Sequence, residues 1–168
     1  MDRQQIGLKL TLDAIGLPAR LDSFSDRLVL QKSLYLSQVA GVQLGYNFNW
    51  YLRGPYSPAL TRDAFTIVEE LNQGLDESPG WKLDDSSQQR LAKVRQLIGH
   101  IPADELPARL ELLASVGFLL PTRTAQGKTS RQLREILLRY GKTYSVEQID
   151  NAIEELKQHG LYPENSSR

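Results

Sequence analysis

The most informative absence in this sequence of 168 residues is cysteine, of which there is none. Without thiols the chain cannot form disulfides, use a cysteine nucleophile or build a zinc or iron–sulfur site on sulfur. Histidine is almost as scarce, because only His100 and His159 occur, far apart in the sequence and each near an expected helix end. A helix-terminal cation is the commoner role for such residues, so we predict no metal site.

Long apolar runs are also missing. No segment approaches the roughly 18 apolar residues that a membrane-spanning helix needs, and the first residues, Met1–Gln5, are too polar for a signal peptide. We therefore expect a cytoplasmic protein with no membrane partner. The hydrophobic share of 40% and the charged share of 24% are ordinary for a globular domain.

The formal net charge is zero, but the charges are segregated along the chain. The segment 123–142 holds one acid, Glu135, and the segment 69–85 holds one base, Lys82. The basic segment contains Arg123, Lys128, Arg131, Arg134, Arg139 and Lys142, and the acidic one contains Glu69, Glu70, Asp76, Glu77, Asp84 and Asp85. The favoured interpretation is a solvated basic helix that faces the acidic segment.

Apolar spacing and capping residues predict a mainly α fold, a compact helical domain of six or seven helices. The expected helices span residues 3–15, 26–42, 58–73, 86–98, 104–120, 130–140 and 146–159. Ser57 and Pro58 form a helix start, and Ser145 with Gln148 forms a capping box. We expect residues 1–160 to form a single domain, with 86–160 as its helical C-terminal half and 161–168 as a flexible tail.

A small β element is expected between the second and third helices. Tyr46–Arg53 alternates apolar and polar residues, which predicts a strand with Tyr46, Phe48, Trp50 and Leu52 on its buried face, ending at Gly54-Pro55. Trp81–Leu83 is the candidate partner strand, which would make the fold winged-helix-like. The preceding helix, 26–42, is apolar on most of its circumference, so Lys32 within its apolar arc must reach solvent or find a partner.

The stretch from Trp50 to Pro58 is the most distinctive candidate site. A helix N-terminus with an arginine and two tyrosines nearby suits a carboxylate, a phosphate or a partner's acidic side chain. Alternatively, the turn at Gly54-Pro55 only fixes the angle between strand and helix, with Tyr56 in the core and its hydroxyl bonded to Lys32 or Gln31. Both readings stay open.

We find no catalytic constellation and predict no catalytic residues and no cofactor. Gly127-Lys128-Thr129 matches the end of a phosphate-binding loop, but Thr122 stands where the motif needs its first glycine. Adjacent carboxylates such as Glu69 and Glu70 point about 100° apart on a helix and do not form a dyad.

Two motifs in series carry a family resemblance. Leu30-Gln31-Lys32 with Tyr35, followed by Leu52-x-Gly54-Pro55-Tyr56-Ser57-Pro58, resembles the helical domain of the Panacea (SocA-like) antitoxins and the related YwgA-like proteins. The resemblance covers residues 28–71. It implies a compact helical fold with a small β element and action by binding, either neutralising a toxin or presenting it to a protease.

The leading hypothesis is a non-enzymatic, antitoxin- or adaptor-like module that binds a partner protein through the surface around Arg53 to Arg62. Its predicted binding residues are Gln31, Lys32, Tyr35, Tyr51, Arg53, Gly54, Pro55, Tyr56, Ser57 and Arg62. The alternative is a winged-helix-type DNA-binding regulator that uses Lys128, Arg131, Arg134 and Arg139 of segment 123–142. The zero net charge argues against the alternative, because nucleic-acid-binding domains are usually basic overall.

Overall fold

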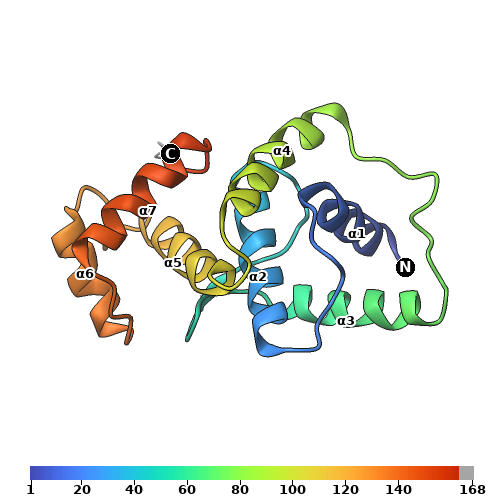
Figure 1. The fold of residues 1–168 in the computed structure, drawn as a ribbon, viewed down its shortest axis with the longest axis horizontal. Helices are drawn as coiled ribbons and strands as arrows, with labels where there is room; N and C mark the ends of the chain where they lie inside the picture. Colours follow the sequence, from blue (N-terminus) through green and yellow to red (C-terminus); the bar gives the residue numbers. More distant parts are fainter. Residues whose placement is uncertain (163–168) are drawn as a thin grey trace.

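The protein is mainly helical in the computed structural model, which describes residues 1–162 (Figure 1). These residues form seven helices and one two-stranded antiparallel sheet, as predicted. In chain order the elements are α1 (Arg3–Ile15), α2 (Phe24–Val39), β1 (Asn49–Tyr51), β2 (Gly54–Tyr56), α3 (Pro58–Asn72), α4 (Asp85–His100), α5 (Leu106–Leu119), α6 (Ser130–Arg139) and α7 (Val146–Gln158). None of the helices in this described part is long and apolar enough to span a membrane.

The central helix is α2, which contacts α1, α3, α4, α5 and strand β2. Its side chains are buried on most sides, as the apolar pattern predicts. Ser23 caps the helix in a capping box with Asp26, so α2 begins at Phe24, two residues earlier than predicted. It ends at Val39 rather than at 42, and Gly41 follows with a φ of 99°.

The remaining helices pack on two sides of α2. Figure 1 shows α1 and α3 on one side and α5, α6 and α7 on the other. Helix α1 lies against α4 and α3, whereas α5 joins α2 and strand β2 to α7, which in turn packs on α6. One hydrophobic core cluster extends from Leu8 to Leu161. Leu161, assigned to the predicted flexible tail, is fully buried, and residues 163–168 of that tail lie outside the described residues.

The β element differs from the predicted one. Strand β1 covers three residues of the expected Tyr46–Arg53, and it pairs with β2, so that Asn49 lies opposite Tyr56 and Tyr51 opposite Gly54. The predicted end of the strand is therefore the start of its partner, and the assignment of a strand to Trp81–Leu83 is wrong. Leu52 is exposed rather than buried, because it lies at the tip of this hairpin.

The alternation that predicted a longer strand has another cause. Tyr46 is buried without being in a strand, because the side-chain amide of Gln38 on α2 binds both its backbone N–H (2.9 Å) and its carbonyl (2.8 Å). Phe48 packs edge-on against Tyr35 of α2, with ring centroids 5.4 Å apart. The apolar residues before β1 thus pack against α2 rather than forming one face of a strand.

Candidate functional site

A groove of about 560 Å³ lies between the β1–β2 hairpin and the first turns of α2 and α3. We call it the hairpin groove, and it is lined by Phe24, Arg27, Leu28, Gln31, Lys32, Tyr51, Leu52, Arg53, Gly54, Tyr56, Thr61 and Phe65. Six of the predicted binding residues are in this set, although they come from two segments of the chain: Gln31, Lys32, Tyr51, Arg53, Gly54 and Tyr56.

The other four predicted residues lie elsewhere. Pro55 and Ser57 are buried where the hairpin enters α3; both bind α2 through backbone atoms, and the Ser57 side chain also caps α3. Tyr35 points into a different part of the core, where its ring contacts Phe48 and Phe118. Arg62 is exposed on α3 and does not line the groove.

Gln31 fixes the start of α3 to α2. Its side-chain oxygen accepts from the Ser57 N–H at 2.9 Å, and its amide nitrogen donates to the Ser57 carbonyl at 2.9 Å and to the Thr61 hydroxyl at 2.8 Å. Thr61 in turn donates to the Tyr56 hydroxyl at 3.0 Å, so this hydroxyl binds neither of the partners predicted for it, Lys32 and Gln31. The turn therefore has a structural role, and it also forms a wall of the groove.

Lys32 lies in the wall of the hairpin groove and is only 2% exposed. Its ammonium donates to the carbonyl of Pro55 at 2.6 Å, so the partner that its buried position demands is a backbone oxygen. Burial lowers the pKa of Lys32 to about 8, with Glu111 opposing the shift and Lys142 adding to it. The carbonyl contact holds the hairpin against α2.

Lys32 should make stability depend on pH. Its pKa is about 8 in the folded protein and 10.5 ordinarily, so between these values the unfolded chain binds a proton that the folded chain lacks. The free energy of unfolding should then rise with pH above about 8, by up to about 1.4 kcal/mol per pH unit. Urea unfolding from about pH 7 to about pH 9, about one unit below the ordinary pKa of tyrosine, measures this rise.

Lys32→Met should abolish the pH-dependent rise, whereas Lys128→Met, at an exposed lysine, should retain it. Only the slope is compared, because Lys32→Met also removes the hydrogen bond to Pro55 and the cost of burying the ammonium, which change stability by amounts of opposite sign. A rise of equal size in both variants would contradict the assignment to Lys32.

A cluster of charges around the buried Glu111 adjoins the hairpin groove through Arg53. Glu111 on α5 accepts from the Lys142 ammonium at 2.7 Å and faces the Arg53 guanidinium at 3.5 Å. The Lys142 ammonium also lies 5.8 Å from the ring centre of Trp50 on β1. Glu111 therefore joins α5, the hairpin and the turn after α6 through one carboxylate.

This cluster corrects the interpretation that the basic segment faces the acidic one. Lys142 of the segment 123–142 binds Glu111, and none of the ion pairs within residues 1–162 joins 123–142 to 69–85. The four residues of the DNA-binding alternative, Lys128, Arg131, Arg134 and Arg139, are exposed, and none forms an ion pair within that same part of the chain.

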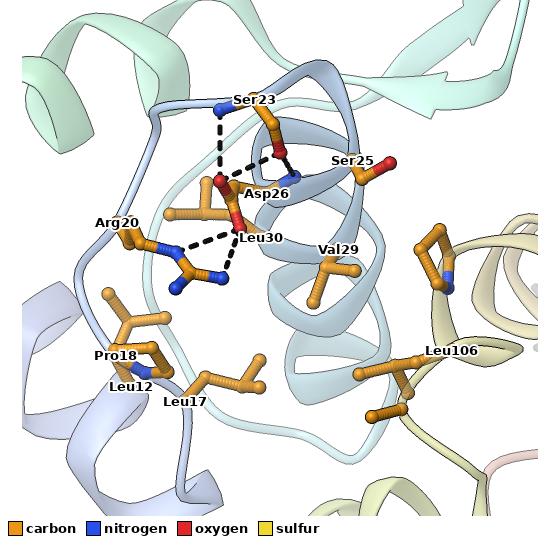
Figure 2. A pocket seen from close by; sticks show the side chains of 12 residues that line it. Leu12, Leu17, Pro18, Arg20, Ser23, Ser25, Asp26, Val29, Leu30 and Leu106 are labelled. Atoms are coloured by element: carbon orange, nitrogen blue, oxygen red, sulfur yellow. Dashed lines mark hydrogen bonds and ion pairs between the residues drawn. The ribbon is translucent and has the colours of Figure 1, made fainter.

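A second crevice, of about 310 Å³, lies at the N-terminus of α2 (Figure 2). Asp26 is its most conspicuous polar side chain, and Figure 2 shows its carboxylate between Ser23 and Arg20. Hydrogen bonds from Ser23 and the neighbouring Arg20 lower the pKa of Asp26. Because backbone, hydroxyl and guanidinium donors already occupy both oxygens, Asp26 serves the helix cap rather than a ligand.

The two histidines, predicted as separate helix-end residues, lie together in space. Their ring centroids are 6.2 Å apart, since the end of α4 meets the end of α7. The Nδ1 atom of His159 lies 2.9 Å from the carbonyl oxygen of Glu155. Within residues 1–162 no group of three or more histidine or carboxylate side chains is placed to hold a metal ion.

Comparisons of this chain with models of protein families, with curated proteins and with solved structures find no match in any of the three. Evidence on the role of the hairpin groove therefore comes from the residues that line it. It combines an open apolar rim, three cationic side chains and walls held by buried hydrogen bonds.

Proposed function

We propose that this protein is a non-enzymatic, cytoplasmic, antitoxin- or adaptor-like module that binds a partner protein in the hairpin groove. The main support for this proposal is the exposed apolar rim of the groove. Four large apolar side chains are 49% to 79% exposed there: Phe24, Tyr51, Leu52 and Phe65. Clustered exposed apolar side chains are typical of protein interaction sites.

The construction of the rim supports this proposal. Phe24 comes from α2, Tyr51 and Leu52 from the hairpin and Phe65 from α3, so three elements hold the rim in place. Aromatic residues and arginine are enriched at interfaces, and the Arg53 guanidinium lies 5.7 Å from the ring centre of Phe24. Within the segment that resembles the Panacea antitoxins, Gln31, Lys32 and Gly54 line the groove, which agrees with action by binding.

Leu52→Asp should strongly weaken partner binding. A single partner captured from a lysate of the native host by the wild-type protein should bind the variant at least about tenfold more weakly, because a charge replaces an apolar contact at the interface. Leu52 is 79% exposed at the hairpin tip, so the substitution leaves the core intact. The affinity is measured with the purified partner, and thermal unfolding checks the fold.

Leu138→Asp provides the matched control, because Leu138 is an exposed leucine on α6, away from the groove lining. It should bind the partner as the wild-type protein does. The proposal fails if the wild-type protein recovers no discrete partner, or if Leu52→Asp recovers the same one with unchanged affinity.

A DNA-binding regulator is the second candidate, favoured by the four exposed basic residues Lys128, Arg131, Arg134 and Arg139. This candidate predicts a different effect of substitutions: Arg134→Glu would abolish binding to duplex DNA, and Leu52→Asp would not. Each phosphate contact would contribute about −0.9 to the slope of log affinity against log salt. A flat salt dependence excludes this candidate.

A further inference from the structure

We infer that the hairpin groove selects a partner segment in which an aspartate or glutamate stands beside a large apolar side chain, an inference that rests on the proposed function. The groove lining contains three cationic side chains, Arg27, Lys32 and Arg53, and no carboxylate. Such one-sided charge beside apolar rings is complementary to an acidic, amphipathic peptide.

Arg27 has donors available for a carboxylate. Its guanidinium makes a single hydrogen bond within the described chain, from Nη1 to the carbonyl oxygen of Leu21 at 2.9 Å. A guanidinium has five N–H groups, so most of them remain available. The bond to Leu21 and the half-buried position hold the side chain in place, which reduces the entropy lost on binding.

Arg53 is held on the opposite side of the same groove. Its guanidinium carbon lies 5.7 Å from the ring centre of Phe24, and its Nη1 lies 3.5 Å from Glu111. Glu111 binds Lys142 more closely, at 2.7 Å, so one carboxylate serves two cations. Arg27 and Lys32 form no ion pair within residues 1–162, and Arg53 shares its carboxylate with Lys142, so a partner's acidic side chain would offset an excess of positive charge.

The apolar part of the lining accommodates the neighbouring side chain of the partner. Leu28 is buried, whereas Phe24, Tyr51 and Phe65 are open to solvent. The rings of Tyr51 and Tyr56 pack 5.5 Å apart and form one wall. An aromatic or aliphatic side chain can fill this space while the acid beside it reaches Arg27 or Arg53.

Selection from a displayed library of random peptides of about 12 residues tests the inference on the full-length protein. The enriched peptides should carry an aspartate or glutamate next to an aromatic or aliphatic residue. A synthetic copy in which the acid is replaced by its amide should bind at least about tenfold more weakly in fluorescence anisotropy, because a charge-assisted hydrogen bond is lost. This exchange needs no variant protein.

Variants then locate the carboxylate. In Arg53→Gln or Arg27→Gln the acid-to-amide exchange should cost clearly less than in the wild-type protein, whereas in Arg62→Gln, at an exposed arginine outside the groove, the cost should be unchanged. If one arginine variant fails to fold, the other carries the test.

The possible failures are distinguishable. Peptides that lose binding on Leu52→Asp but contain no acid, or tolerate its amide, overturn the inference and leave the proposed function standing. Binding of free small carboxylates with equal strength also overturns the choice of a peptide. Failure to select any peptide that depends on Leu52 overturns the inference, whereas the proposed function is overturned only by the test with the captured partner.

Discussion

Glu111→Gln is expected to lower the free energy of unfolding by about 3 to 5 kcal/mol, the usual range when one partner of a buried ion pair is removed. The change keeps the shape of the side chain and removes only its charge. Lys142 is 5% exposed, and its ammonium lies 2.7 Å from Glu111 Oε1, so it would remain buried without a counter-charge. Lys32, whose pKa responds to both Glu111 and Lys142, adds a further buried cation nearby.

Urea unfolding at about pH 7 measures the loss of stability, and two further variants serve as controls. Glu154→Gln breaks the exposed pair with Lys157, which spans 3.1 Å, and should cost less than about 1 kcal/mol. Glu111→Leu combined with Lys142→Met removes both charges and should recover much of the stability, because apolar replacement of a whole buried pair is often neutral. A cost for Glu111→Gln as small as that for Glu154→Gln would show that the buried pair does not stabilise the fold.

The elements that the sequence predicts best are those with local start signals. Ser57 caps α3 through the Leu60 N–H with Pro58 in the first turn, and Ser145 forms the expected capping box with Gln148 at the start of α7. These contacts lie within three residues along the chain, so residue type and spacing are sufficient to identify them. Helix α1 likewise spans Arg3–Ile15 as predicted, with Gly16 as its left-handed cap.

The hairpin was the least predictable element, because its partner strand carries no strand-like pattern. Gly54-Pro55 is typical of a strand end, yet in the structure these residues open β2. The alternation at Tyr46 and Phe48 reflects contacts with Gln38 and Tyr35 of α2 instead of a ladder. Such long-range contacts leave no separate signal in the sequence.

The candidate site was predictable from the sequence only in part. Lys32 stands out because it is a charge in the middle of the apolar part of α2, and Glu111 stands likewise between apolar residues of α5, although it was not among the predicted site residues. Charges isolated on the two most buried helices are a usable signal, because each requires a polar partner in the core. The groove residues Phe24, Arg27 and Phe65 had no such signal, since exposed and half-buried side chains obey no burial pattern.

Gly54→Ala is expected to destabilise the protein by about 3 kcal/mol, through two separable terms. Gly54 has a φ of 85°, where a β-carbon costs about 1 to 2 kcal/mol. A β-carbon there would also lie 2.4 Å from the Oγ atom of Ser115 on α5, closer than van der Waals contact permits, and relieving that overlap costs about 1 to 3 kcal/mol. Urea unfolding of the purified variant measures the sum.

The cost of the overlap can be removed by changing Ser115. This residue can be replaced without losing a hydrogen bond, because its buried hydroxyl finds no hydrogen-bond partner among the described residues. Ser115→Ala alone should therefore be near neutral or stabilising. In Gly54→Ala/Ser115→Ala the new β-carbon meets the Ser115 Cβ at 3.5 Å, an ordinary contact, so only the backbone term should remain. Gly74→Ala isolates that term independently, since Gly74 has a φ of 75° and nothing within 4 Å of its added carbon.

Agreement between the double variant and Gly74→Ala would mean that the cost of Gly54→Ala beyond the backbone term arises because the hairpin lies so close to α5. That closeness also places Arg53 beside Glu111 and Leu52 at the groove rim, so the same glycine determines the packing and the shape of the proposed binding surface. The structural and the binding readings of the Gly54-Pro55 turn are then not alternatives. If Ser115→Ala restores no stability to the Gly54→Ala variant, the backbone conformation alone requires glycine. The space between the hairpin and α5 would then accept a β-carbon without cost, despite the short distance to Ser115.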